Sequence, residues 1–564
     1  MAKDGQCRVL PNFNKGEIMK TAKLWSSLSG LLLITLCFQS FTFADTVSGI
    51  VYNDKNRNGI LDSREKGVRK VAVSNGRTVV MTDSRGRYKI DIEPYEILFI
   101  SKPSGYGLEV DDNFIPNFFY IHSPEGTPGN LRLRYHGLMP SGKITGEINF
   151  PIYKYKEPEK YDVLLISDPQ TGTNEELDYF RDRIVTELAG RRAVFGITTG
   201  DIVHDNLSLY PRYKEIVAQA GVPWFNVAGN HDINYLAPDD SQSLDTFKRN
   251  FGPSYYSFNW GKAHYIVLDT VFYNGTDPGK RNSSGGYVAK LDERQLNWLK
   301  ADLAFVPKSR LIVLAMHIPI DSIGDSSHGG AIANRKELLE ILSGFENVTA
   351  IAGHLHVTQN VYLGVDSGYM GKKPLHQHII TTAAGTWWSG AKDIEGIPHT
   401  TQADGTPNGY HIMSVKGNTY TVSYKAAGKP GDFQMRIMIE KQGEKKLVSS
   451  MPRSMVNNFQ IVVNLFDGGE NSTVSYRIDD GELTHLKHES RIDTFTFKSY
   501  ENANSFISGQ EIPSSHMWSG SLGQEIKPGV HRINVLAIDE YGMKHSGIKI
   551  FEVVDDTQED MAEK

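Results

Sequence analysis

Five apolar segments decide the fold of this chain: YDVLLIS (161–167), VFGITT (194–199), VPWFNVA (222–228), RLIVLAM (310–316) and NVTAIA (347–352). Runs of this length, rich in Val and Ile and bounded by Gly or Pro, indicate buried strands. Helical patterns lie between some of them, at 175–190 and 334–345. Strand, polar turn and helix in alternation predict an α/β layered sheet with its chemistry at the carboxyl ends of the strands.

The chain of 564 residues is too long for one hydrophobic core, so about two to four domains are expected. Residues 45–155 contain short alternating runs separated by Gly, Asn and Asp, which predict an N-terminal β-sandwich. Residues 156–428 carry the α/β pattern. Residues 429–564 return to strand patterns, TFTFKSY (494–500) among them, and predict a second, immunoglobulin-like β-sandwich with a disordered acidic tail.

Residues 1–44 have the pattern of a secretory signal peptide. A basic segment at 19–23 precedes an apolar run at 28–38, and Thr42-Phe43-Ala44 supplies small residues for cleavage after Ala44. Met19 is a second candidate start. A retained membrane anchor is the alternative, but the apolar run is shorter than the ~20 residues that span a bilayer. We therefore expect an exported protein of a bacterial periplasm or cell surface.

Composition restricts the partners of the mature chain. Both cysteines, Cys7 and Cys37, lie in the segment expected to be removed, so disulfide and thiol chemistry are excluded. The formal net charge is −6 for the full chain and −9 once residues 1–44 are removed, which gives no support for a nucleic-acid partner. We expect no transmembrane span after cleavage.

The segment from Asp54 to Glu65, DKNRNGILDSRE, matches the twelve-residue calcium loop at every position. Its glycine is at position 6, and its flanks are strand patterns, so the helices of an EF-hand are absent. The alternative is a metal-free hairpin rich in Asn and Gly. The predicted ligands are the side chains of Asp54, Asn56, Asn58, Asp62 and Glu65 and the carbonyl of Ile60.

The polar clusters after the five apolar segments supply carboxylate, imidazole and amide groups together. Two divalent metals about 3.5–4 Å apart need such a set, with one ligand bridging. We assign the first metal to Asp168, Asp201 and His356, with Gln170 beside them. The second metal is assigned to Asp201, Asn230, His317 and His354, so that Asp201 bridges.

These clusters resemble the motifs of the calcineurin-like metallophosphoesterase superfamily, in the order Asp-x-His, Gly-Asp, Gly-Asn-His, His and Gly-His-x-His. The flanking β domains make the chain similar to the secreted bacterial branch of that superfamily. The resemblance implies two divalent metals, Mn, Zn or Fe, and a catalytic role for Asp201 and His231. His231 would contact the phosphate and the leaving group without binding metal.

The chain departs from the family pattern at two positions. Gln170 stands where many members have a histidine ligand, and His204 stands where many have an aspartate that orients the catalytic histidine. Asp205 and Asp232 are therefore both candidates for the partner of His231. His204 and Asp205 are candidate substrate-binding residues.

The segment from Trp387 to Asn408 is predicted to be a long loop, and loops of this length are often functional. Trp387 and Trp388 at its start fit a substrate wall and a buried aromatic core equally well. His264, His376 and His378 fall within strand patterns, and we expect them to be structural.

The resemblance implies hydrolysis of a phosphoester by a hydroxide that bridges the two metals. Monoester and diester substrates remain open, as do small molecules and components of the cell envelope. A function of another class is the alternative: a calcium-dependent surface or glycan-binding protein with an inactive phosphoesterase domain.

Overall fold

The computed structural model describes residues 45–276, 286–324, 330–501, 510–523 and 526–556. The signal-peptide prediction and the end of the acidic tail lie outside these ranges. Among the described residues, no helix combines the length and the apolar character needed to cross a bilayer.

Two small sheets form the N-terminal region, as the alternating runs predicted. In the first, β1 pairs with β5, β2 and β9, and β9 with β7. The second has the order β4-β3-β6-β8. The strands are β1 (Asp45–Asn53), β2 (Lys66–Gly67), β3 (Ala72–Ser74), β4 (Val79–Met81), β5 (Arg87–Ile92), β6 (Glu96–Ser101), β7 (Tyr106–Gly107), β8 (Phe119–His122) and β9 (Phe150–Lys154).

The central region contains a five-stranded sheet in the order β12-β11-β10-β21-β22 and a six-stranded sheet in the order β13-β14-β17-β18-β20-β19. Five of its strand pairs are parallel, as expected for an α/β unit. The five-stranded sheet comprises β10 (Lys160–Ile166), β11 (Phe195–Thr198), β12 (Trp224–Asn226), β21 (Gly409–Lys416) and β22 (Thr419–Ala426). The six-stranded sheet comprises β13 (Tyr256–Trp260), β14 (Ala263–Leu268), β17 (Leu311–Met316), β18 (Asn347–Ala352), β19 (Gln359–Leu363) and β20 (Leu375–Ile379).

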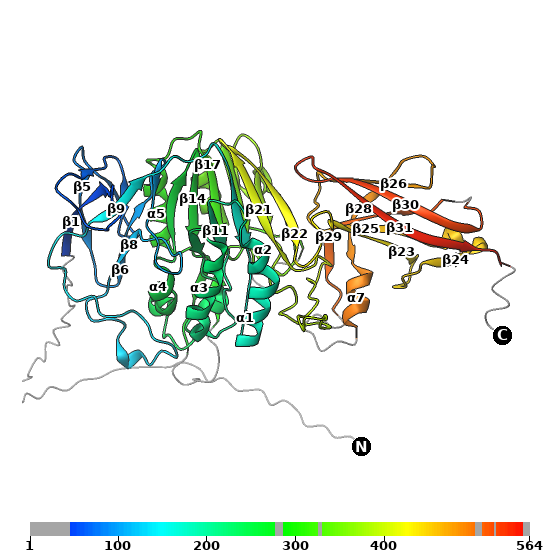
Figure 1. Cartoon of the computed structure of the whole chain (residues 1–564), viewed down its shortest axis with the longest axis horizontal. Helices are drawn as coiled ribbons and strands as arrows, with labels where there is room; N and C mark the ends of the chain where they lie inside the picture. The colour runs from blue at the N-terminus through cyan, green and yellow to red at the C-terminus, as the bar shows by residue number, and fades with distance from the viewer. Residues whose placement is uncertain (1–44, 277–285, 325–329, 502–509, 524–525, 557–564) are drawn as a thin grey trace, which may run out of the picture. The chain divides into compact units, whose positions relative to one another are not determined.

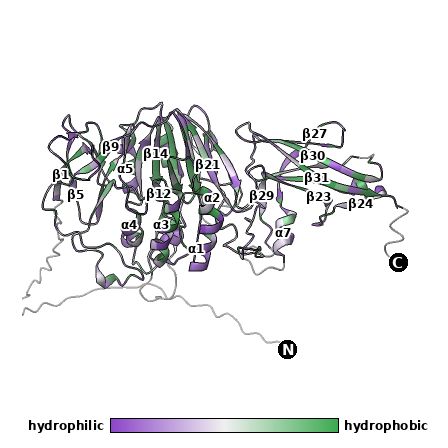
Figure 2. Cartoon of the chain, in the orientation of Figure 1, coloured by the Kyte–Doolittle hydropathy of each residue, from purple (hydrophilic) through white to green (hydrophobic). Residues whose placement is uncertain are grey.

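Alternate residues of β10 enter two different hydrophobic cores. Val163 and Leu165 pack in the core shared with the six-stranded sheet, whereas Leu164 and Ile166 pack against the helices that follow β10 and β11. The five-stranded sheet is therefore covered on both faces at β10, and Figure 2 shows α1 as largely hydrophilic. The helices of this region are α1 (Asn174–Phe180), a π-helical turn (Arg181–Val185), α2 (Thr186–Leu188), α3 (Tyr210–Val217), α4 (Asp245–Phe251), α5 (Glu293–Leu303) and α6 (Arg335–Leu342) (Figure 1). A separate antiparallel pair is formed by β15 (Val271–Tyr273) and β16 (Tyr287–Ala289).

The C-terminal region is again β-rich, with sheets in the orders β23-β25-β29-β28 and β24-β31-β30-β26-β27. Its core includes Ile461, Val463 and Trp518. Its strands are β23 (Met435–Lys441), β24 (Ser450–Pro452), β25 (Phe459–Leu465), β26 (Thr473–Ile478), β27 (Thr484–His485), β28 (Lys487–Ile492), β29 (Pro513–Ser521), β30 (Gly529–Ile538) and β31 (Lys544–Val554).

The predicted strand TFTFKSY is wrong, because these residues form helix α7 (Thr494–Tyr500). The carboxylate of Asp493 accepts a hydrogen bond from the Thr496 amide at 2.7 Å and caps the helix. The guanidinium of Arg436 lies 4.1 Å from the centre of the Phe495 ring. A local cap and a tertiary contact thus override the strand preference of an alternating Thr and Phe sequence.

Candidate metal centre

The predicted metal ligands come from the ends of strands in both central sheets. Asp168, Asp201 and Asn230 follow β10, β11 and β12, which are mutually parallel. His317 and His354 follow β17 and β18, which are also parallel to each other. Because the carboxyl ends of parallel strands meet at one edge, residues far apart in the sequence gather there.

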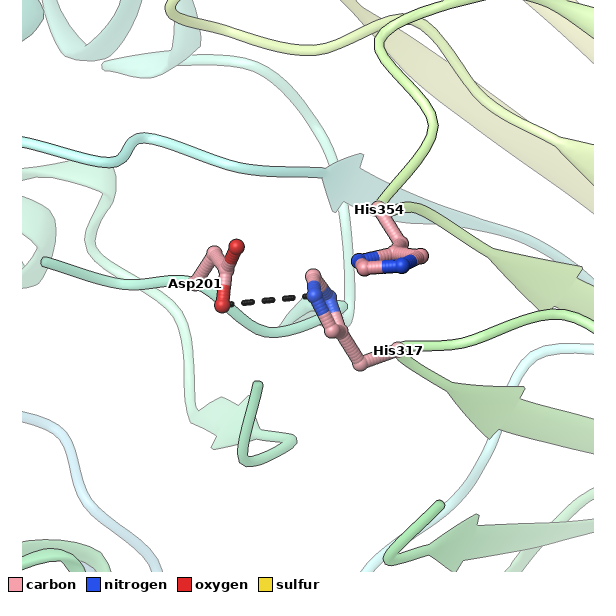
Figure 3. A group of neighbouring side chains, drawn as sticks. All are labelled: Asp201, His317 and His354. Carbon is pink, nitrogen blue, oxygen red and sulfur yellow. Dashed lines mark ion pairs between the residues drawn. The ribbon is translucent and has the colours of Figure 1, made fainter. Parts of the chain in front are cut away.

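Asp201 lies at the centre of this group. His317 Nε2 is 3.2 Å from Asp201 Oδ1, and the His354 ring lies beside that of His317 at a centroid distance of 5.0 Å (Figure 3). One ligand atom from each of these three residues lies within 4.8 Å of the other two. Gln170 Nε2 donates to Asp201 Oδ2 at 3.3 Å, and His317 Nε2 also lies 3.0 Å from Asn230 Oδ1. The group offers carboxylate, imidazole and amide atoms at one point.

Asp168 and His356 form the other side of the group. His356 Nε2 lies 3.8 Å from Asp168 Oδ1, and the His354 amide donates to Asp168 Oδ2 at 3.1 Å. The Ser167 hydroxyl also donates to Asp168 Oδ2. Sequence reasoning missed Ser167, because a serine at the end of a buried strand carries no signal of its own.

Backbone carbonyls orient two of the imidazoles. His317 Nδ1 donates to the Thr199 carbonyl at 2.9 Å, and His356 Nδ1 donates to the Gly385 carbonyl at 2.7 Å. Each bond fixes the orientation of its ring and directs Nε2 toward the group, which is the usual arrangement in a metal-binding histidine. A backbone carbonyl has no signature in the sequence, so Thr199 and Gly385 could not be predicted.

Unsatisfied polar atoms test whether a metal fits these residues. Among the described residues, His356 Nε2 and Gln170 Oε1 are buried without a hydrogen-bond partner. Buried polar atoms normally have partners, and both atoms are metal-ligand types on side chains that lie beside Asp201 and Asp168. Burial lowers the pKa of His354 to about 3 and keeps its imidazole neutral, as a ligand requires. The donor set fits divalent metal ions.

The backbone at these positions is strained. The φ angles are 44° at Asp168, 42° at Gln170, 46° at Asp201, 75° at His354 and 51° at His356. Residues other than glycine rarely adopt positive φ, and each such residue costs of order 1–3 kcal/mol. Strain of this kind concentrates at functional sites, where the surrounding structure holds it in place.

The glycines before the ligands serve two different purposes. Gly200 has a φ of 94°, so there glycine lets the chain turn sharply off its strand. Gly229 instead has an ordinary φ of −110°, and a Cβ atom there would lie 2.2 Å from Asp201 Oδ1. A Cβ at Gly353 would lie 1.9 Å from the Ser167 hydroxyl oxygen. At Gly229 and Gly353 glycine is needed for close approach.

His231 faces the group and contacts Asp205. His231 Nδ1 is 2.7 Å from Asp205 Oδ1, and His231 Nε2 lies 4.0 Å from Asp201 Oδ2. Burial alone would lower the pKa of His231, but the carboxylates of Asp201 and Asp205 outweigh it and raise the pKa to about 9. The His204 ring packs edge-on against His231, with centroids 4.5 Å apart. Asp205 and His204 thus surround the imidazole.

The second candidate partner of His231, Asp232, is bonded elsewhere. Its carboxylate accepts hydrogen bonds from the Gly229 amide at 2.8 Å and from the Tyr210 hydroxyl at 2.9 Å. Burial and the neighbouring Asp201 carboxylate raise the pKa of Asp232 to about 7. Asp232 therefore shapes the turn that carries Asn230 and His231.

The two tryptophans of the long loop have different surroundings. Trp388 is 5% exposed and donates from Nε1 to the Pro169 carbonyl at 2.8 Å, which places it in the core beneath Asp168. The Trp387 ring stacks on the His356 ring, with centroids 4.1 Å apart and an interplanar angle of 17°. One tryptophan supports the backbone of the group and the other covers one of its histidines.

The loop from Asp54 to Glu65 folds back on its own side chains. The buried Asp54 carboxylate accepts from the amides of Arg57 and Gly59, both at 2.7 Å. Glu65 accepts from the Lys55 amide at 2.7 Å, and Asp62 Oδ2 accepts from Asn56 Nδ2 at 2.8 Å and Asn58 Nδ2 at 3.2 Å. Three carboxylates and two amides gather within twelve residues, while the Ile60 side chain is exposed.

Family models match most of the described chain. The model described as calcineurin-like phosphoesterase matches residues 161–358. The models for the N-terminal and C-terminal parts of calcineurin-like phosphoesterase match residues 55–134 and 377–545. The three matches follow one another in the order expected for one family.

Individual relatives share the central region. Human tartrate-resistant acid phosphatase type 5 is 24% identical over 235 residues, which are 38% of this chain and 67% of that protein. A probable glycerophosphodiester phosphodiesterase, GpdQ, of Arcobacter nitrofigilis is 28% identical over 163 residues, 28% of this chain and 55% of that protein. The chain thus spans between about half and two thirds of the length of these relatives.

A solved purple acid phosphatase, PPD1 from yellow lupin (Lupinus luteus), is 12% identical. The similarity covers 68% of this chain and 66% of the lupin chain, with a TM-score of 0.33.

Proposed function

The chain belongs to the calcineurin-like phosphoesterase family, and from that premise we propose that it is a phosphoesterase that uses two divalent metals. One metal would be held by Asp168, Gln170, Asp201 and His356, and the other by Asp201, Asn230, His317 and His354. The supporting observation is the buried pair of unpartnered ligand atoms, His356 Nε2 and Gln170 Oε1, beside the two aspartates. The ions would be Mn, Zn or Fe, since imidazole, carboxylate and amide donors suit all three.

Two divalent metals, when bound, supply Lewis acidity toward a phosphoryl group and lower the pKa of bound water. The surrounding side chains would bind and orient the substrate at the metals. Asp201 lies between the two ligand sets. Asp205 holds the His231 ring by its Nδ1 atom, so that Nε2 points toward Asp201.

His231 is proposed to stabilise the phosphoryl oxygens or to protonate the leaving oxygen. Its side chain is 22% exposed, which leaves it accessible from solvent, whereas Asp201 is buried. An imidazole held by a carboxylate and directed at the reacting group is the usual arrangement for general acid–base catalysis. His204, in contact with His231, and Trp387, on His356, are proposed to border the substrate.

The substrate class is tested by a panel of aryl phosphates, phosphodiesters and nucleotides with added manganese, zinc or iron. We expect turnover of a monoester or a diester. Chelation should abolish this turnover, and one of these metals should restore it. Metal-independent turnover, or none with any metal, would overturn the proposal. Both a phosphatase and a phosphodiesterase are among the relatives, so monoester and diester substrates are both carried into the panel.

A third metal ion, calcium, is proposed for the N-terminal region. Calcium would be bound by the carboxylates of Asp54, Asp62 and Glu65 and by the Ile60 carbonyl. The side-chain amides of Asn56 and Asn58 would rotate so that their oxygens face the ion. The supporting observation is that both amides already meet one oxygen of Asp62. Because the site has only three carboxylates, we expect weak binding, with a Kd for calcium on the order of 10⁻⁴–10⁻³ M.

Residues 156–428 are proposed to be the catalytic unit, with 45–155 and the immunoglobulin-like 429–564 as accessory domains. Export to a periplasm or cell surface is proposed from the signal pattern, with a small-molecule or cell-envelope phosphoester as substrate. Sequencing of the mature N-terminus tests this, since cleavage after Ala44 predicts a start at Asp45. An exported protein that retained Met19 would contradict cleavage.

The alternative is a calcium-dependent surface or glycan-binding protein with an inactive central domain. This alternative requires that some metal ligands have been lost, whereas residues of ligand type stand at all seven predicted positions, near the ends of the central strands. Binding to glycans in the absence of any hydrolysis would favour it.

A further inference from the structure

Three titratable side chains meet at a second point that the catalytic proposal does not use. His378 lies on β20, His411 on β21, and Asp467 follows β25 of the C-terminal region. His378 Nε2 is 2.7 Å from Asp467 Oδ1, and His411 Nε2 is 3.4 Å from the same oxygen. One ligand atom from each residue lies within 4.8 Å of the other two, as for Asp201, His317 and His354.

The cluster is buried between separate elements. β20 belongs to the six-stranded central sheet and β21 to the five-stranded one, so the two histidines come from different sheets. Both histidine side chains are fully buried, and the Asp467 side chain is 11% exposed. The cluster is also separate from the catalytic group, because His411 pairs with Leu165, three residues or about 10 Å along the chain before Asp168.

The charge of the cluster needs compensation. Among the described residues, the ion-pair partners of Asp467 are these two histidines, and no lysine or arginine pairs with it. A buried carboxylate is normally paired with a cation or bound to a metal, and neutral imidazole is a good metal ligand.

A neighbouring histidine shows the contrast with a purely structural role. His376, also on β20, uses both ring nitrogens, with Tyr420 Oη at 2.8 Å and Asn360 Oδ1 at 2.8 Å. His378 and His411 share only Asp467, and their Nδ1 atoms are buried without a hydrogen-bond partner among the described residues. Unlike His376, these two histidines therefore direct their Nε2 atoms at one shared carboxylate oxygen, Asp467 Oδ1.

We propose that His378, His411 and Asp467 bind a zinc ion that fastens the C-terminal region to the central sheets. Two imidazoles and one carboxylate are zinc ligands, and tetrahedral zinc with bonds of about 2.0–2.2 Å separates its ligand atoms by about 3.3 Å. The observed 3.4 Å between His411 Nε2 and Asp467 Oδ1 matches this spacing, and His378 needs only a small shift. A water molecule completes the coordination.

The test counts zinc in the full chain after loading with zinc and dialysis. Asp201→Ala serves as the background, because it removes the bridging residue of the catalytic group. This background is expected to keep one zinc per chain, and adding His411→Gln or Asp467→Asn is expected to remove it. His376→Gln is the matched control and is expected to leave the count unchanged.

The comparison does not depend on the catalytic proposal. If Asp201→Ala retained its metals, the difference between the control and the two test variants would still be one zinc per chain. Equal zinc content in the His376→Gln, His411→Gln and Asp467→Asn chains would overturn the inference.

A second measurement avoids substitutions, in case a variant fails to fold. Crystals of the unaltered chain grown with zinc are expected to give an anomalous peak at the zinc edge between His378 Nε2 and His411 Nε2. Anomalous density confined to the catalytic group would overturn the inference as firmly as an unchanged zinc count.

Discussion

The loop from Asp54 to Glu65 and the group around Asp201 both gather possible metal ligands, but they do so in opposite ways. All the proposed calcium ligands lie within twelve consecutive residues, and the Asp54 carboxylate holds the loop amides directly. The ligands around Asp201 extend from Asp168 to His356 and come from strand ends in two sheets. A contiguous site depends on its own loop, whereas a dispersed site depends on the whole central fold.

The backbone shows the same difference. In the loop, positive φ falls on Gly59 at 73° and Arg57 at 60°. In the central group it falls on five proposed ligands that are not glycine. That strain persists because packed sheets hold it, so damage to one central ligand is expected to spread to the others.

The largest effect is expected at Asp201. Asp201→Ala removes the residue that lies between both ligand sets, so both metals and all measurable turnover should be lost together. The loss should exceed the roughly 10²–10⁴-fold that a single acid–base group contributes. Elemental analysis beside kinetics is the measurement, and retention of two metals per chain would contradict a bridging role.

His231→Ala is expected to separate turnover from metal binding. His231 meets Asp201 only at 4.0 Å and is not proposed as a ligand. Turnover should fall by roughly 10²–10⁴-fold while both metals remain bound. Full turnover in this variant, or loss of metal, would show that its role is assigned wrongly.

A smaller loss is expected from Asp205→Asn. The side chain keeps its shape and one hydrogen bond to His231 Nδ1 but loses its charge. Residues that orient a catalytic group typically contribute about 10–100-fold. Turnover should fall within that range, and adding Asp205→Asn to His231→Ala should cause little further loss. Two full, additive losses would indicate that Asp205 acts independently.

The smallest effect on catalysis is expected from Glu65→Ala. The change removes a carboxylate from the loop and should abolish calcium binding measured by calorimetry on the full chain. Turnover should stay the same, because no proposed ligand of the central group lies in the loop. If the heat of calcium binding were the same in the Glu65→Ala variant, the calcium proposal would be wrong.

Much of the fold could be predicted because the pattern is local. The five apolar segments coincide with β10, β11, β12, β17 and β18 to within a residue or two, and the polar residues after each one are the predicted ligands. The hydrophobic periodicity of a strand and the turn residues that end it lie within a few positions of each other, so a short stretch of sequence is enough to predict the strand. The same reasoning failed for Thr494–Tyr500, where strand-forming residues are made helical by the Asp493 cap and by contact with Arg436.

By itself, the sequence determined which residue types stand at the strand ends, and so which chemistry the central region can support. Only the tertiary structure decided between Asp205 and Asp232 as the partner of His231, because both lie within a few residues of a ligand and only three-dimensional contacts separate them. It also decided that Trp387 covers His356 while Trp388 is buried. The meeting of His378, His411 and Asp467 has no sequence signature, because their proximity arises from packing between two sheets and a third region.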